Sequence, residues 1–195
     1  MDFLQIVILA IIQGITEWLP ISSSGHLVLA QQLFQIEPPI FFDALLHIAT
    51  LISLFIIFRE DIWRVTKAFC TRQWKTEYGK LGLYIIIATI PTGMIGLLFK
   101  EQLEATFASN FLLGIGFIFT GIIIYLTKYT KPHRELKTSD AIIIGIAQGI
   151  SIIPSISRSG ATISTGLFLG VKKTNYNIFF SHIHPCNPWC NNFRI

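Results

Sequence analysis

Hydrophobic residues run through this chain in long stretches, and charged residues gather between them. We expect membrane-length helices where such a stretch approaches the ~20 residues needed to cross a bilayer, at about 2–19, 40–58, 81–99 and 109–127. Other apolar stretches are too short to span alone, at about 25–35, 140–153 and 160–171. The pattern therefore predicts an all-α polytopic membrane protein in which half-helices flank turns.

One polar phrase occurs twice within this apolar sequence. Residues 13–26 read QGITEWLPISSSGH, and residues 148–162 read QGISIIPSISRSGAT. Each copy has Gln-Gly-Ile, a helix-breaking proline, a group of serines and a glycine. Irregular backbone at bilayer depth is tolerated only where it is buried in protein or lines a cavity. Two matched interruptions in two halves predict one site at a pseudo-symmetric interface.

The loop charges predict an orientation for the two copies. Segments 59–80 and 128–139 are rich in Lys and Arg, whereas segment 100–108 has a single lysine, Lys100. The positive-inside rule places the two basic segments in the cytoplasm and the third outside. Followed back along the chain, the first turn then enters from outside and the second from the cytoplasm. We therefore expect an inverted-topology repeat with two re-entrant helix-turn-helix segments.

Composition agrees with a membrane protein. Hydrophobic residues make up 52% of the 195 residues and charged residues only 13%, about half the charged share of a soluble domain. The net charge of +4 lies in the loops, so it indicates topology and not nucleic-acid binding. The cysteines, Cys70, Cys186 and Cys190, form no recognisable disulfide or metal pattern.

Two ionisable residues stand out within apolar sequence. Glu17 follows Gln13 by four residues, so both side chains leave one helix face. A carboxylate near the bilayer interior is a candidate functional group, although an acid at a helix end can also snorkel to water. Arg158 is the only base in its apolar segment, and its guanidinium suits a phosphate or carboxylate. A structural pair between Arg158 and Glu17 is the alternative.

Hydroxyl and imidazole groups surround these charges. The serines of both copies precede half-helix N-termini, where free N–H groups favour an anion, at Ser22, Ser23, Ser24, Ser157 and Ser159. His26 follows the first group and could act as an acid, a base or a hydroxyl activator, or as a hydrogen-bonded core residue. Asp43 and His47 share one face of the second helix, where they support either the fold or the site. The set predicts a phosphoryl-group site for a substrate with a lipid tail, and a transporter of a phosphorylated solute could use the same groups.

These residues closely resemble the undecaprenyl-diphosphate phosphatases of bacterial inner membranes, also called bacitracin-resistance proteins. That family has an (E/Q)xxxE motif, seen here from Gln13 to Glu17, followed by a PxSSxGH-like stretch at residues 20–26. Its PGxSRSxxT motif corresponds to residues 154–162, and the stretches 42–47 and 88–93 are also similar. The likeness extends over about residues 1–174.

The resemblance implies hydrolysis of the C55 polyprenyl diphosphate to its monophosphate and inorganic phosphate, which recycles the lipid carrier of cell-wall synthesis. The enzyme would lie in the bacterial plasma membrane with its site open to the outer face, assisted by magnesium or calcium. A carrier or flippase for the phosphorylated lipid, and an inactive remnant, are the alternatives. Homo-oligomer formation is left open.

The resemblance also assigns roles to residues. Glu17 would be the essential acid, binding metal or activating the nucleophile, and Gln13 a weaker metal ligand because it lacks charge. Ser23 is the candidate nucleophile with His26 as its partner, although an activated water could attack instead. Arg158 would clamp the diphosphate. The remaining substrate-binding positions would be Ser22, Ser24, Gly25, Ser157, Ser159, Gly160 and Thr162.

Two positions depart from the family pattern. Ser155 stands where the family has glycine, which would cost about 1 kcal/mol if the backbone there needs a positive φ; we expect reduced or normal activity. After Thr174 the composition shifts to Asn, His, Cys and Pro, where family members continue with further membrane helices. We hypothesise a frameshift in the gene or its sequencing, which would divide the chain into a membrane phosphatase domain at 1–174 and an atypical tail at 175–195.

Overall fold

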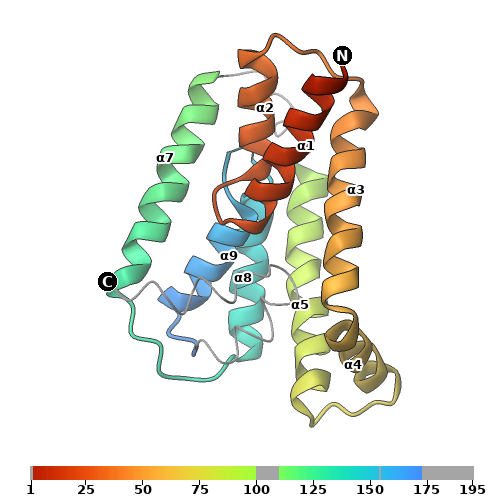
Figure 1. The fold of residues 1–195 in the computed structure, drawn as a ribbon. Helices are drawn as coiled ribbons and strands as arrows, with labels where there is room; N and C mark the ends of the chain where they lie inside the picture. Colours follow the sequence, from red (N-terminus) through yellow and green to blue (C-terminus); the bar gives the residue numbers. More distant parts are fainter. Residues whose placement is uncertain (1, 100–109, 154, 173–195) are drawn as a thin grey trace.

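The computed structural model describes residues 2–99, 110–153 and 155–172, and within these ranges the chain is helical (Figure 1). Apart from an isolated bridge between Arg134 and Val171, the described residues contain no β structure. Two helices are long and apolar enough to cross a membrane, α5 (Glu77–Leu98) and α7 (Asn110–Leu126), the second with its extension to Tyr129. The expected all-α polytopic fold is confirmed.

The bent pair α3 (Ile40–Ile57) and α4 (Arg59–Cys70) differs from the expectation. Residues 59–80 were predicted as a basic loop, but most of them form α4 and the start of α5. The two helices meet at 78°, and together they provide a third candidate span. Helix α4 forms because Val65 and Phe69 recur on one face and pack over Gly82 of α5. Glu60 and Asp61 also lie in its first turn and Lys67 in its last, which suits the helix dipole.

The two polar phrases form two helical hairpins. The first joins α1 (Phe3–Trp18) to α2 (Ser23–Leu33), and the second joins α8 (Thr138–Ile150) to α9 (Arg158–Phe168). All four lie within a few residues of the predicted stretches. Helix α1 has 16 residues, fewer than the ~20 expected for a full span, because the chain turns before Pro20.

The hairpins point toward each other and their turns meet near the middle of the molecule (Figure 1). A Cβ atom added to Gly25 in the first hairpin would lie 2.9 Å from the Cα of Ser155 in the second. A Cβ atom added to Gly160 would lie 3.1 Å from the carbonyl oxygen of Pro20. Each turn thus uses a glycine to admit the backbone of the other. Their inverted, re-entrant placement in a bilayer stays a prediction.

The remaining elements support the second hairpin. Helix α5 packs against α8, and its Leu81 and Ala88 share a buried cluster with Ile144.

A second buried cluster holds the first hairpin together, and it includes Leu9, Leu27 and Ile36. The short helix η1 (Thr127–Tyr129) leads into a loop that the Arg134–Asp140 ion pair fastens to α8 at 2.6 Å. Many large apolar side chains of α3, α5 and α7 remain exposed, as expected of surfaces that face lipid.

The expected external segment at 100–108 and the tail at 175–195 lie outside the described residues. The division of the chain at residue 174 and the frameshift hypothesis therefore stay predictions.

Candidate active site

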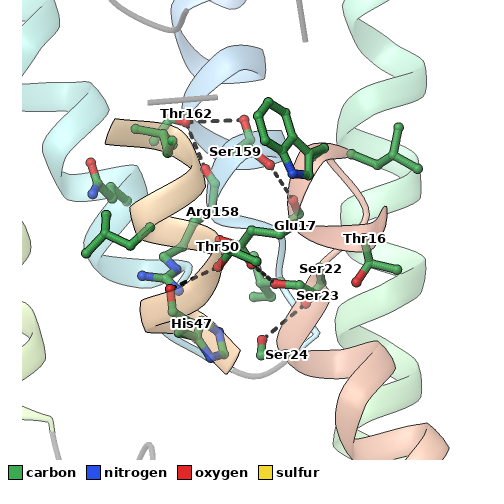
Figure 2. Close-up of a pocket in the computed structure, with 17 residues that line it drawn as sticks. Thr16, Glu17, Ser22, Ser23, Ser24, His47, Thr50, Arg158, Ser159 and Thr162 are labelled. Carbon is green, nitrogen blue, oxygen red and sulfur yellow. Dashed lines mark hydrogen bonds between the residues drawn. The ribbon is translucent and has the colours of Figure 1, made fainter. Parts of the chain in front are cut away.

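A cavity of about 300 Å³ lies where the two turns face helix α3 (Figure 2). Its wall includes polar residues from both copies of the repeat and apolar residues from α1 and α3. The polar residues predicted from sequence that line it are Glu17, Ser22, Ser23, Ser24, His47, Ser157, Arg158, Ser159 and Thr162. The structure therefore brings together residues that are more than a hundred positions apart in the chain.

The two copies build the same local structure at the start of α2 and α9. Ser22 and Ser157 are the N-cap residues, and their hydroxyls accept hydrogen bonds from the N–H of Gly25 at 3.3 Å and of Gly160 at 3.0 Å. Serine is a preferred N-cap because its oxygen satisfies an N–H group that the helix leaves unpaired. Both helices therefore begin at the cavity, and their positive dipole ends favour an anion between them.

Glu17 and Ser23 form the central contact of the first copy. The Ser23 hydroxyl donates a hydrogen bond to the Glu17 carboxylate across the turn between α1 and α2. Gln13, almost fully buried, donates to the same oxygen from its Nε2 at 3.1 Å. Glu17 is thus held by its neighbours and lines the cavity.

Arg158 comes from the second copy, at the position that aligns with Ser23 in the first. Its side chain lines the cavity, and among the described residues its guanidinium has no hydrogen bond or ion pair. The alternative of a structural pair with Glu17 is therefore wrong for this arrangement. The backbone oxygen of Arg158 accepts a hydrogen bond from Thr162 at 2.8 Å, which holds the first turn of α9.

His26 is not placed as the sequence suggested. Its Nδ1 lies 2.7 Å from the carbonyl oxygen of Ser22, and its ring packs edge-on against Phe117 with centroids 5.0 Å apart. It does not line the cavity, and the partner of the Ser23 hydroxyl is Glu17. The structure therefore does not support the predicted pairing of His26 with Ser23.

The other supporting residues divide between site and fold. His47 lines the cavity, whereas Asp43 accepts a hydrogen bond from Gln31 of α2 at 2.8 Å and ties α3 to the first hairpin. Gly25 and Gly160 lie behind the cavity wall, at the contact of the two turns.

Thr120 of α7 is a residue that sequence reasoning missed. Its hydroxyl donates to the carbonyl oxygen of Ser155 and accepts from the N–H of Ser157, both at 3.1 Å. It is 6% exposed and sits within an otherwise apolar stretch, FLLGIGFIFTGIII. A single hydroxyl within this apolar stretch is the sequence feature that could have indicated a structural role for Thr120. Thr120 holds the turn from which Arg158 projects.

Comparison with known proteins shows the family of this chain. Residues 6–182 match the family described as "Bacitracin resistance protein BacA". The chain belongs to the BacA family. The match includes both hairpins apart from the first three residues of α1, and every residue named above as lining the cavity.

Several BacA relatives carry the name undecaprenyl-diphosphatase. The protein from Carboxydothermus hydrogenoformans is 47% identical over 178 residues, which cover 89% of this chain and 65% of the relative. That from Korarchaeum cryptofilum is 42% identical over 181 residues, covering 89% and 69%. That from Methanobrevibacter smithii is 38% identical over 190 residues, covering 89% and 69%. The chain thus spans about two thirds of the length of these relatives.

Proposed function

We propose that this chain hydrolyses undecaprenyl diphosphate to undecaprenyl phosphate and inorganic phosphate, recycling a lipid carrier of cell-wall synthesis. The observation that most directly supports this is the Ser23–Glu17 hydrogen bond in a cavity that also contains Arg158. Transfer of a phosphoryl group is assisted by a nucleophile with an adjacent base and by a cation in the same cavity. Family membership and the names of the relatives support the same activity.

In the first step the Ser23 oxygen attacks the terminal phosphorus and its proton passes to Glu17. The bond from that phosphorus to the bridging oxygen breaks, and polyprenyl phosphate leaves. Arg158 and the N-termini of α2 and α9 stabilise the charge on the phosphoryl oxygens. In the second step water attacks the phosphorus of the phosphoserine and the bond from that phosphorus to the Ser23 oxygen breaks. Glu17 returns its proton to the departing Ser23 oxygen, and the protons of the water leave with the inorganic phosphate. Direct attack by water, without a covalent step, is the alternative that the first experiment below separates.

A divalent cation, magnesium or calcium, is part of the proposal. Among the described residues no group of three or more His, Cys, Asp or Glu could hold a metal ion. Magnesium, however, is usually bound by one or two carboxylates together with substrate phosphates. The Glu17 carboxylate suits that role, and the buried Oε1 of Gln13 has no hydrogen-bond partner among the residues that the structure describes. When bound, the cation would offset the negative charge of the phosphoryl oxygens.

The cavity also suits a lipid substrate in a membrane. Trp18, Leu19, Leu51, Leu54 and Ile156 line it beside the polar groups, so a prenyl chain can leave the phosphate site along apolar side chains. We place the protein in the cell membrane with the site open to the outer face. The Lys and Arg of 59–80 and 128–139 support that orientation.

The test is phosphate release from polyprenyl diphosphate by the purified chain in detergent, comparing Ser23→Ala with Ser53→Ala. Ser53 lies exposed on α3 and bonds only its own helix, so its loss should leave the rate unchanged. Removal of the nucleophile should reduce the rate at least about a hundredfold. A Ser23→Ala variant with the rate of the native chain would favour attack by water. A native chain that binds the lipid without releasing phosphate would point to a carrier.

A further inference from the structure

His47 places an imidazole in the cavity from a third direction. Helix α3 provides one wall of the cavity, and His47 and Thr50 are its polar side chains there (Figure 2). The Thr50 hydroxyl already donates a hydrogen bond within its own helix, to the backbone carbonyl oxygen of His47 at 2.9 Å. His47 is therefore the residue of α3 whose side chain is left to contact a phosphate.

The hydrogen bonds of His47 decide which nitrogen faces a ligand. Its Nδ1 lies 2.8 Å from the carbonyl oxygen of Asp43. A carbonyl oxygen only accepts hydrogen bonds, so Nδ1 has the hydrogen and Nε2 is the basic nitrogen. Among the described residues Nε2 has no hydrogen-bond partner within the protein. The ring is thus fixed at one nitrogen and available at the other.

The charged side chains of the cavity do not by themselves compensate the negative charge of a diphosphate, and His47 can contribute to that compensation. A lipid diphosphate has roughly two to three negative charges at neutral pH, since a phosphate loses its second proton near pH 6. Among the described lining residues, Arg158 contributes one positive charge and Glu17 one negative charge. These two side-chain charges cancel, so a bound diphosphate would depend on the proposed divalent cation and on hydrogen-bond donors to offset its charge in a low-dielectric region, where uncompensated charge is costly. A further hydrogen-bond donor or cation facing the phosphate would reduce that cost.

We propose that His47, which lines the cavity from α3, binds the diphosphate through Nε2. This inference rests on the proposed function for its substrate, and it assigns His47 a substrate-binding role. Nε2 accepts a hydrogen bond from a protonated phosphate oxygen, or as imidazolium it donates one to an ionised oxygen. The contact takes no part in bond breaking.

The test compares His47→Ala and His47→Gln with His133→Gln. His133 is exposed in the loop before α8, so its substitution controls for loss of an imidazole elsewhere. Two experiments use the full 195-residue chain in detergent. The first gives the KM and kcat for polyprenyl diphosphate, and the second gives the dissociation constant of inorganic pyrophosphate. The pyrophosphate measurement needs no turnover, so it remains informative if the native chain is not a phosphatase.

Loss of a hydrogen bond to a charged group should raise both the KM and the pyrophosphate dissociation constant of His47→Ala about tenfold or more. We expect kcat to change less than about threefold, and His47→Gln to recover part of the affinity because its amide can also donate. His133→Gln should match the native chain. Unchanged affinities in folded His47→Ala would overturn the proposal, as would a fall in kcat alone. The native chain could also bind pyrophosphate through His47 without releasing phosphate from the lipid. That result would refute the proposed phosphatase activity and still support the contact between His47 and the diphosphate.

Discussion

Two serines in the turns before α2 and α9 have backbone angles that L-residues rarely adopt. Ser22 has φ of 68° and Ser155 has φ of 67°. Ser155 is fully buried, and the motif resemblance implies glycine at this position. The sequence left open whether this position needs a positive φ, and the structure shows that it has one. The hydroxyl of Thr120 holds the carbonyl group of this residue, and Gly25 leaves room for its backbone.

Ser155→Gly should therefore stabilise the protein by about 1 kcal/mol, since glycine adopts a positive φ without the steric cost of Cβ. Activity should be retained or increased. Thermal unfolding in detergent measures the change. Ser53→Gly, in the middle of α3, serves as the opposite control, because glycine inside a helix destabilises by about 0.5–1 kcal/mol. Loss of stability in Ser155→Gly would show that the serine side chain outweighs the strain.

At this scale, sequence predicted the groups whose chemistry is unusual in apolar surroundings. Glu17, Ser23 and Arg158 all line the cavity. His26 was paired with Ser23 because the two are close in sequence, but a helix directs its ring toward Ser22 and Phe117. Thr120 could not be assigned, because its partners lie thirty-five or more positions away along the chain.

Among the helices, α5 and α8 make the closest contact. A Cβ added to Gly145 would lie 2.2 Å from the carbonyl oxygen of Ala88, so the two backbones touch. The Thr92 hydroxyl donates to the carbonyl oxygen of Gly145 at 2.7 Å. Small residues and hydrogen bonds of this kind are how membrane helices associate. This contact fixes the second hairpin against the longest helix.

Gly145→Ala should destabilise the protein by roughly 2 kcal/mol or more, because overpacking against backbone cannot be relieved by a rotamer change. Gly93→Ala on α5 is the matched control, since a Cβ there meets nothing within 4 Å. The two variants are compared by thermal unfolding in detergent. Equal unfolding temperatures would contradict the packing described between α5 and α8.

Helix α7 contacts the active site through one hydroxyl. Thr120→Val keeps the shape of the side chain and loses both hydrogen bonds to the turn before α9. We expect it to lower kcat/KM about tenfold, because one lost bond of this kind contributes about 1 kcal/mol and the freed turn orients Arg158 less well. Thr120→Ser keeps the hydroxyl and should recover most of the rate. Equal kinetics of the two variants would show that Thr120 has no positioning role.

The sequence predicted helix positions well where an apolar stretch is bounded by a proline. Helix α1 ends just before Pro20, and α3 begins directly after Pro39. Helix α4 was missed because its charges dominate its sequence. Its apolar face is narrow and becomes apparent only once Val65 and Phe69 are seen against α5.

Across the whole molecule, the two copies of the repeat have a similar local fold but contribute different reactive side chains to the site. Gln13 aligns with Gln148, Ser22 with Ser157 and Gly25 with Gly160, and these residues build equivalent turns. The reactive positions differ, because Glu17 aligns with Ile152 and Ser23 with Arg158. The acid and nucleophile thus come from the first hairpin and the cation from the second. Neither hairpin alone contains the complete site.

The most direct test is metal-dependent phosphate release from undecaprenyl diphosphate by the purified chain, with Glu17→Gln and Arg158→Ala measured beside it. We expect phosphate release that stops with a chelator and falls at least about a hundredfold in each variant. The two substitutions together should cost little more than one, because both disable the same step. Release that persists in either folded variant would contradict a site shared between the two hairpins.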